Sequence, residues 1–583
     1  MGKVSVSAFT IVIGALLAAG SVVADCRIET LAELPVTMSD LRPHVPAKVN
    51  GTEVEFLADS GAFYSVISPS SAKRLGLALK AMPGARIVGV NGSAAISLAT
   101  VKTFTWVDQT IPNVEFIVGG TNVDTGLVGV LGQNIWSLWD VEYDLANGVI
   151  RLMRPFDCKG RMLAYWAGDK PYSAMDINIA NEGGQHTIGI AYVNGAKIRA
   201  TFDTGAGWSV LTLPAARRAG VNFKDPAVVD GGFSGGFGSE IVRNWIVPVG
   251  GFKVGDEQIL HTRLRVGDFP TMSTDMLIGA DFFLSHRIYV ANSQHRMYFT
   301  YNGGPVFNLE STPQGQASTA AQSGSDIPKD ADGYARRAAA LASRRAYGSA
   351  IADFSEAIKR APTNATYLSD RAAAYISDHQ PTLAMSDYDR VLTLKPADVS
   401  TLVARARLRL TAKDKSGAAA DLDLADRSAP KDADSRLEVA ELYERVDRVA
   451  SALSQFDAWI GVNPKNPRMA LALNGRCWER ALLGQDLDKA MADCDAALKL
   501  VPGSANILDS RGLVHLSLGH FDLAIADYDA ALKQNPAIAW SLYGRGIARL
   551  RVGQTAAGKA DIAAAAVLQP DLPADAAKFR ITP

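Results

Sequence analysis

Two stretches of the sequence decide the fold, because each copies the other in order and residue type. They read VEFLADSGAFYSVIS at 54–68 and IRATFDTGAGWSVLT at 198–212. An Asn-Gly pair precedes each stretch, at Asn50-Gly51 and Asn194-Gly195, and Asn-Gly is a strong signal for a hairpin turn. A lone Asp-Thr-Gly indicates only a turn. Two copies in the same surroundings indicate a duplicated unit.

The duplication continues downstream of each stretch. An apolar pair and a glycine follow, as Val130-Leu131-Gly132 and Leu277-Ile278-Gly279, and closing strand pairs are expected at 141–152 and 287–299. Short apolar runs are broken throughout by Gly, Asn and Asp, which is typical of β-structure. The N-terminal half is therefore predicted to be all-β.

This pattern resembles the retropepsin-like aspartic peptidases, in the two-lobed arrangement of pepsin-like enzymes, from residue 35 to about residue 301. In that family each lobe supplies one aspartate from an Asp-(Thr/Ser)-Gly loop. The resemblance implies a bilobal fold and a catalytic dyad of Asp59 and Asp203 that hydrolyses peptide bonds without a metal or other cofactor. Two carboxyls about 3 Å apart cannot both ionise easily, so they share one proton. The ionised one activates a water, and the protonated one polarises the scissile carbonyl.

Residues beside each aspartate are expected to support it. They are Ser60, Gly61 and Ser65 in the first copy, and Thr204, Gly205 and Ser209 in the second. The two glycines let the backbone turn tightly, so that its amides point at the carboxylates. The hydroxyls next to the aspartates are expected to hydrogen-bond across the pseudo-twofold axis, and the later serines to make hydrogen bonds behind the loops.

Glycine-containing turns after each aspartate predict mobile hairpin flaps over the substrate. The first is expected at Gly89 and Gly92, and the second, with Phe233 and Phe237, within 231–238. Pepsin-like enzymes carry an aromatic residue on the first flap, but none lies between Arg86 and Leu98. This departure leaves the substrate specificity open.

The C-terminal half is helical in pattern and has a 34-residue period. Prolines share its register at Pro328, Pro362, Pro396, Pro430, Pro464, Pro502, Pro536 and Pro570, with one step of 38 residues before Pro502. Small residues recur at fixed positions where two helices approach, and each proline ends a second helix. The pattern resembles the tetratricopeptide repeat, with about seven repeats in 330–583. The longer step implies an insertion of about four residues near 467–478.

Stacked repeats of this kind form a superhelix with a concave groove, and the resemblance implies that the groove binds a peptide or protein partner. A spacer or a dimerisation module is the alternative. Acidic pairs recur along the array, at Asp387/Asp389, Asp421/Asp423, Asp493/Asp495 and Asp527/Asp529. We expect a solvated helix face, not metal binding, because sites for hard cations need several oxygens converging in one loop.

The two halves are predicted to be separate. Residues 311–329 are polar and rich in Ser, Gln, Ala and Gly, as in a flexible linker. The expected organisation is a peptidase region at 25–310, with lobes at about 35–158 and 170–301, followed by this linker and the array. Few contacts are expected to cross between the halves.

Residues 1–24 are predicted to be a secretory signal peptide. Lys3 is the only charge before an apolar run that ends in a small-residue cleavage pattern at Ala24. The mature chain is therefore expected to be exported, periplasmic or secreted, with no stable membrane insertion. An uncleaved N-terminal anchor is the alternative, since the run approaches the roughly 20 residues needed to span a bilayer.

Four cysteines allow three disulfide connectivities. Cys26 and Cys158 bracket the first lobe, and Cys477 and Cys494 lie on the two predicted helices of the fifth repeat. Locality favours these two pairs, and buried free thiols are the alternative.

Composition and motifs exclude several classes of function. Lys+Arg number 59 and Asp+Glu 60, so the chain lacks the basic excess of a nucleic-acid binder. H-E-x-x-H and C-x-x-C are absent, which removes the usual sequence support for a zinc peptidase or a dithiol oxidoreductase. Two hypotheses remain: an exported aspartic endopeptidase whose repeats recruit a protein substrate or partner, and a non-catalytic periplasmic peptide-binding scaffold.

Overall fold

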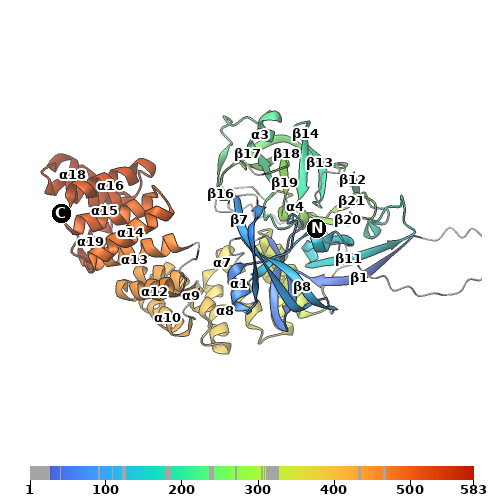
Figure 1. Cartoon of the computed structure of the whole chain (residues 1–583), viewed down its shortest axis with the longest axis horizontal. Helices are drawn as coiled ribbons and strands as arrows, with labels where there is room; N and C mark the ends of the chain where they lie inside the picture. Colours follow the sequence, from blue (N-terminus) through green and yellow to red (C-terminus); the bar gives the residue numbers. More distant parts are fainter. Residues whose placement is uncertain are drawn as a thin grey trace, which may run out of the picture.

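The structure is a computed structural model, and Figure 1 shows two β-rich lobes followed by a helical array. It describes residues 26–583 with these exceptions: 40, 90–91, 108, 121–126, 178–185, 235–241, 270–271, 304–305, 308, 310–326, 431–432, 434, 464–465 and 467. The predicted fold class, an all-β bilobal region followed by an all-α repeat array, is confirmed. The predicted signal peptide and residues 311–326 of the predicted linker lie outside the described residues.

The first lobe is a sheet with the order β2-β3-β4-β9-β5-β8-β7-β6, in which an additional β3–β7 pairing closes six strands into a barrel. Its strands are β2 Thr37–Ser39, β3 Arg42–Val49, β4 Thr52–Ala58, β5 Val66–Ile67, β6 Leu79–Gly89, β7 Gly92–Trp106, β8 Gln109–Gly119 and β9 Leu127–Leu131, with short helices α1 Pro69–Arg74 and α2 Gln133–Trp136. Asn50 and Gly51 both have positive φ, as the two central residues of the tightest hairpin turns require.

The second lobe repeats this topology in the order β13-β14-β19-β15-β18-β17-β16, closed by a β13–β17 pairing. Its elements are β13 Ile188–Val193, β14 Ala196–Phe202, β15 Val210–Thr212, α3 Leu213–Arg218, β16 Val229–Ser234, β17 Val242–Val254, β18 Glu257–Gly267, β19 Met276–Ile278 and α4 Ala280–Ser285. Asn194 and Gly195 also have positive φ, as their counterparts do. The duplication read from the sequence is thus a duplication of the barrel.

A third sheet joins the lobes, with the order β1-β11-β10-β20-β21-β12. Its elements are β1 Arg27–Pro35, β10 Asp140–Asp144, the short 3-10 helix η1 Leu145–Asn147, β11 Val149–Phe156, β12 Ser173–Asp176, β20 His286–Ala291 and β21 Arg296–Tyr301. The two predicted closing strand pairs meet here, because β10 of the first lobe pairs antiparallel with β20 of the second. Glu142 on β10 is fully buried and accepts hydrogen bonds from Arg151 and Arg287, one from each lobe. This sheet therefore fixes how the two barrels face each other.

The helical half consists of seven antiparallel pairs in the described residues. They are α5/α6 (Ala331–Ser343, Tyr347–Arg360), α7/α8 (Ala365–Ser377, Pro381–Leu394), α9/α10 (Val399–Thr411, Lys415–Ser428), α11/α12 (Ser435–Arg445, Val449–Val462), α13/α14 (Met469–Leu483, Leu487–Leu500), α15/α16 (Ala505–Ser517, Phe521–Gln534) and α17/α18 (Ala539–Arg551, Thr555–Leu568), followed by α19 Leu572–Lys578. Helix α13 has 15 residues where α15 has 13, and the connection before α13 is also longer than the usual one. These additions account for the 38-residue step.

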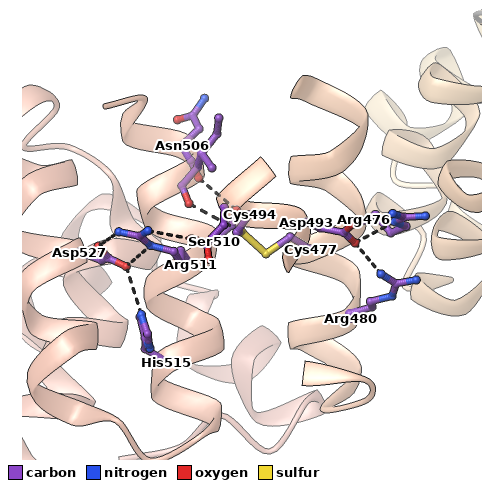
Figure 2. Close-up of a disulfide and its surroundings, with 12 residues drawn as sticks. Arg476, Cys477, Arg480, Asp493, Cys494, Asn506, Ser510, Arg511, His515 and Asp527 are labelled. Atoms are coloured by element: carbon purple, nitrogen blue, oxygen red, sulfur yellow. Dashed lines mark hydrogen bonds and ion pairs between the residues drawn. A yellow bond between two sulfur atoms is a disulfide. The ribbon is translucent and has the colours of Figure 1, made fainter. Parts of the chain in front are cut away.

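The chain has two disulfides, and they are the two cysteine pairs that the sequence analysis favoured. Cys26–Cys158 ties the start of β1 to the segment after β11. Cys477–Cys494 links α13 to α14 within the fifth repeat (Figure 2). All four cysteines are therefore paired.

An ion-pair ladder runs through the array, where an Arg on the first helix of a repeat makes two hydrogen bonds to an Asp on the second. The pairs are Arg337–Asp353, Arg371–Asp387, Arg405–Asp421, Arg476–Asp493, Arg511–Asp527 and Arg545–Asp561. Figure 2 shows two of these pairs on either side of the disulfide. In the fourth repeat Val439 and Gln455 take the corresponding places, and Arg436 hydrogen-bonds Gln455 instead.

The ladder corrects one expectation. The first aspartate of each acidic pair is not on a solvated face: Asp387 is 2% exposed and Asp421 is 3% exposed, because the partner arginine compensates the burial of the charge. The second aspartate of several pairs meets the arginine of the following repeat, as Asp389 does with Arg405. The acidic pairs thus join neighbouring repeats. The spacing of two residues within each pair does not by itself show this.

The expectation that few contacts join the two halves is wrong. Helix α5 packs against β2 and η1 of the peptidase region, and Figure 1 shows the first repeats beside the first lobe. One apolar cluster contains Val36 and Leu145 together with Ala338, Phe354 and Leu368 of the first two repeats. The first repeats therefore share a hydrophobic core with the peptidase region.

No helix in the described part of the chain is long and apolar enough to cross a membrane. In the same residues, no group of three or more His, Cys, Asp or Glu side chains is arranged to hold a metal ion.

Replacing Cys26 and Cys158 by serine is expected to lower the free energy of unfolding by about 4–5 kcal/mol in the chain-entropy view, because the bond closes a loop with a sequence separation of 132. The matched control is the Cys477/Cys494 double serine variant, whose separation is 17 and whose expected loss is about 3 kcal/mol. Denaturant unfolding of the oxidised proteins measures both losses. A larger loss from the short loop would contradict the loop-length explanation.

Candidate active site

The two aspartates lie on equivalent loops, one at the end of a central strand in each barrel. Asp59 follows β4 and its amide donates to the carbonyl of Leu131, while Asp203 follows β14 and its amide donates to the carbonyl of Ile278. These carbonyls belong to the apolar pairs that precede Gly132 and Gly279. The adjacent strands β9 and β19 run parallel to β4 and β14, so each apolar-apolar-Gly motif supports one loop from behind.

Ser60 and Thr204 bind each other's loop reciprocally. The Ser60 amide donates to Thr204 Oγ1 at 3.0 Å, and the Thr204 amide donates to Ser60 Oγ at 2.9 Å. Each hydroxyl also donates across the interface, from Thr204 to the carbonyl of Ala58 and from Ser60 to the carbonyl of Phe202. Four hydrogen bonds thus hold the loops of two lobes in one arrangement, as expected from the sequence.

Gly61 and Gly205 are required by close approach between the loops. A Cβ built on Gly61 would lie 2.1 Å from Cγ of Asp203, and one on Gly205 would lie 2.3 Å from Cγ of Asp59. Each glycine therefore makes room for the opposite carboxyl. This relation places the two carboxyls next to each other across the pseudo-twofold axis.

Backbone amides orient both carboxyls. Oδ1 of Asp59 accepts from the amides of Gly61 and Ala62 at 2.9 and 2.7 Å. Oδ1 of Asp203 accepts from Gly205 and Ala206 at 2.8 and 3.2 Å. The glycine-permitted turn therefore supplies two donors to each carboxyl, in the same way in both lobes.

Burial and mutual repulsion raise the pKa of both carboxyls. For Asp59 the largest cause is removal from water, followed by the nearby Asp203 charge, and together they hold its pKa well above 3.8. Burial also raises the pKa of Asp203, but a hydrogen bond from Asp59, the two amides and His186 act in the opposite direction. The surroundings therefore favour the ionised form more at Asp203 than at Asp59.

Ser65 and Ser209 hold the loops from behind, through partners that the sequence analysis missed. Ser65 Oγ donates to Asn134 Oδ1 and accepts from the Gly132 amide. Ser209 Oγ donates to Asp281 Oδ1 and accepts from the Gly279 amide. Asn134 and Asp281 each lie two residues after the supporting glycine, so aligning the two copies further downstream would have found them.

The partner of Ser209 in the second lobe has an ionisable side chain, whereas the partner of Ser65 in the first lobe does not. Asp281 is 4% exposed, and burial raises its pKa to about 6 against the lowering effect of the Ser209 hydrogen bonds. Asn134 makes the equivalent contacts without a titratable group. The frame of the site is symmetric, whereas its charges are not.

Three further residues border the dyad without a preceding sequence signal. Gln133 is buried and donates through Nε2 to the Ser60 carbonyl at 2.8 Å. Tyr143 is buried on the joining sheet, and the nearby Asp59 charge adds to burial in raising the pKa of its hydroxyl. The ring of His186 lies 5.9 Å from that of Phe63 on the first loop, and burial lowers the pKa of His186.

The predicted flaps are strand pairs whose tips are outside the described residues. Gly89 ends β6 and pairs with Gly92 at the start of β7. Phe233 lies on β16 opposite Arg243, whereas Phe237 lies outside the described residues. The role of these four residues in substrate binding stays a prediction.

The repeat array reaches the active-site loop of the second lobe. Trp208 lies on this loop, and the guanidinium carbons of Arg265 and Arg345 lie 5.5 and 6.0 Å from its ring centroid. Arg345 belongs to the turn between α5 and α6. One aromatic ring next to the dyad thus meets a cation from each half of the chain.

Comparisons with known proteins agree with this architecture. A family model described as aspartyl protease matches residues 45–135 and 190–282, and a tetratricopeptide repeat model matches 510–573. No curated protein is detectably similar to the chain.

Several solved structures are similar to the helical part. A tetratricopeptide repeat protein from Parabacteroides merdae is 16% identical with a TM-score of 0.34, covering 43% of this chain and 98% of that protein. The C-terminal part of a tetratricopeptide repeat-containing protein from Cytophaga hutchinsonii is 15% identical with a TM-score of 0.30. The match covers 37% of this chain and 87% of that one.

Gly61→Ala is expected to lower any hydrolytic activity at least about 100-fold, because the new methyl group must displace the Asp203 carboxyl. Gly250→Ala is the matched control, since its nearest neighbour would be an ordinary contact at 3.4 Å. Steady-state kinetics on one peptide compares the two variants. Equal activities would contradict the close approach of the loops.

A bell-shaped dependence of kcat/KM on pH is expected, since the pair works with one shared proton. The falling limb should lie well above pH 3.8, because burial and Asp203 raise the pKa of Asp59. A raised carboxyl pKa also means that the pair favours folding most at low pH and less as pH rises. Asp59→Asn should therefore be inactive yet at least as stable as the wild type at pH 7, which thermal unfolding measures. A falling limb near pH 3.8 would contradict the assignment.

Proposed function

We propose that this chain, which combines two retropepsin-like aspartyl protease segments with tetratricopeptide repeats, is an exported aspartic endopeptidase that uses Asp59 and Asp203. The observation that carries the proposal is the pair of carboxyls packed against each other's glycines, with Asp203 buried and Asp59 half-buried. A buried pair of acids that must share a proton is costly to the fold and has an evident chemical use.

Each carboxyl has a distinct role in this mechanism. Ionised Asp203 takes a proton from a water that attacks the scissile carbonyl carbon, and protonated Asp59 donates a hydrogen bond to the carbonyl oxygen. Collapse of the tetrahedral intermediate requires a proton on the leaving nitrogen, which Asp203 now carries. The amides of Gly61, Ala62 and Gly205 keep both carboxyls oriented throughout.

Export is supported by two features of the chain. Residues 1–24 have the pattern of a secretory signal peptide. All four cysteines form disulfides, which persist in oxidising compartments and are rare in the cytosol of most organisms. We infer a periplasmic or secreted location from these observations together.

The repeats are proposed to recruit a protein substrate or partner. Tetratricopeptide repeats suggest protein binding, and the array begins next to the active-site loop through Arg345 and Trp208. A partner held on the array would be at high effective concentration near the dyad. The array therefore supplies affinity, and the two lobes supply the chemistry.

Cleavage of an unstructured peptide at acidic pH by the purified chain tests the proposal. Pepstatin-type inhibition and loss of at least about 10³-fold in kcat/KM for Asp203→Asn are expected, since the two carboxyls act as one unit. Ser70→Ala, a change on the exposed side of α1, is the control for handling and folding. An inactive wild type with an intact fold would favour the non-catalytic peptide-binding scaffold.

Residues 25–396 are expected to form a more stable fragment than residues 25–310, because the first two repeats complete the apolar cluster of the peptidase region. We expect the shorter fragment to unfold at least about 5 °C lower. It should also turn over a short peptide more slowly, while the longer fragment matches the full chain. Equal melting temperatures would mean that the shared cluster contributes little.

A further inference from the structure

The segment after the last long helix pair turns back along the array. Lys578 at the end of α19 donates from Nζ to Oδ1 of Asp447 at 3.1 Å, across a sequence separation of 131. Asp447 lies in the turn between α11 and α12, in the fourth repeat. The segment 578–581, Lys-Phe-Arg-Ile, therefore reaches from the seventh repeat to the fourth.

The side chains of this segment alternate between the array and solvent. Phe579 and Ile581 are partly buried against the apolar cluster of α13, α14 and α15, and Ile581 also joins the cluster around Tyr543. Arg580 between them is exposed. The groups that face the repeats are thus Lys578 and the two apolar side chains of Phe579 and Ile581.

Several partly buried side chains of this cluster lie on the first helices of the repeats. Trp478 on α13, Leu516 on α15 and Trp540 on α17 are partly buried in the same cluster, and the rings of the two tryptophans meet edge to face at 5.1 Å. First helices contact one another directly along this part, as α13 with α15 and α15 with α17. Their closeness places them on the inner side of the curve, where a solenoid presents its concave face.

Carboxylates lie at the fourth-repeat end of this surface. Asp447 accepts from Lys578 and Lys415, and both lysines lower its pKa against the raising effect of burial. Glu444, one turn earlier on α11, accepts a hydrogen bond from Trp478 Nε1. An acidic end beside two tryptophans suits a cationic side chain followed by apolar ones.

We propose that the inner face of repeats four to seven binds peptide segments in which a basic residue is followed by two apolar side chains spaced two apart, and that segment 578–581 occupies this site as an internal ligand. The proposal deepens the proposed recruitment role and rests on it for its biological purpose. The seated segment defines the chemistry of the partner: Lys or Arg, an aromatic residue, any residue, and an aliphatic residue. A partner gains access by displacing 578–581.

The internal ligand should weaken partner binding by mass action. A tethered segment acts at an effective concentration on the order of millimolar, so a peptide that binds the open site with a Kd of about 10 μM would bind the closed chain about 100-fold more weakly. Opening the site should restore the stronger binding. The site is therefore latent until a sufficiently concentrated or multivalent partner arrives.

The test measures binding of a fluorescein-labelled peptide with the sequence of 571–583 to the full chain by fluorescence anisotropy. Every protein in this test also carries Asp203→Asn, so the labelled peptide is not cleaved during the measurement. The binding result can therefore be interpreted even if the peptidase proposal fails. The open variant carries Phe579→Ser and Ile581→Ser. We expect it to bind the peptide at least about tenfold more tightly than the chain with the native segment, and a peptide with the same two serines to bind neither protein.

A charge exchange checks the register of the bound peptide. In the open variant, Asp447→Lys should weaken binding of the native peptide about threefold, and a peptide with Glu in place of the lysine should recover it. If the open variant loses its helical circular dichroism signal, the Lys578→Ala variant is used in its place. Loss of the ion pair with Asp447 is expected to make peptide binding about threefold tighter. Equal binding to closed and open chains, or no binding to a folded open chain, would overturn the proposal.

Discussion

The reciprocal hydrogen bonds of Ser60 and Thr204 are the constraint on which the peptidase region depends. They connect loops that belong to different barrels, so the dyad exists only when both lobes are folded and correctly apposed. The joining sheet meets the same requirement on a larger scale, with β10 of one lobe paired to β20 of the other. Gly61 and Gly205 then become obligatory, because each lies against the opposite carboxyl. Local sequence, sheet topology and site geometry are thus consequences of one close contact.

The frame around the two carboxyls is symmetric, whereas the charged groups near them are not. Backbone amides, hydroxyls and supporting glycines are matched between the lobes. The differences are in nearby side chains. Asn134 behind the first loop corresponds to Asp281 behind the second, and His186 lies near Asp203. Of these groups, His186 lowers the pKa of Asp203 against the raising effect of burial, and Asp59 has no such neighbour among the causes of its own raised pKa. The duplicated loops supply the pair, and neighbouring side chains give its two members different surroundings.

The array is joined to the two-lobed region by packing and is held together by buried ion pairs. Helix α5 completes an apolar cluster of the peptidase region, and Arg345 reaches the ring of Trp208 on the active-site loop. Within the array, each arginine of the ladder satisfies an aspartate that burial would otherwise make costly. Several arginines also reach the preceding repeat, as Arg405 does through Asp389. These contacts link neighbouring repeats directly.

Much of this protein follows from its sequence alone. The duplicated Asp-(Ser/Thr)-Gly loops, their Asn-Gly hairpins and the 34-residue proline register determine the fold class, the candidate dyad and the repeat array, because each is a local pattern with its own physical cause. Only the tertiary structure decided the contacts between distant segments. The core shared by the two halves and the return of 578–581 to Asp447 join residues that no sequence period connects. Asn134, Asp281 and the arginines of the ladder stand at regular sequence positions, but only the packed structure shows that they are hydrogen-bond partners. Side-chain burial is set by the whole fold, so aspartates that look solvated on one helix are buried once the next helix packs on them.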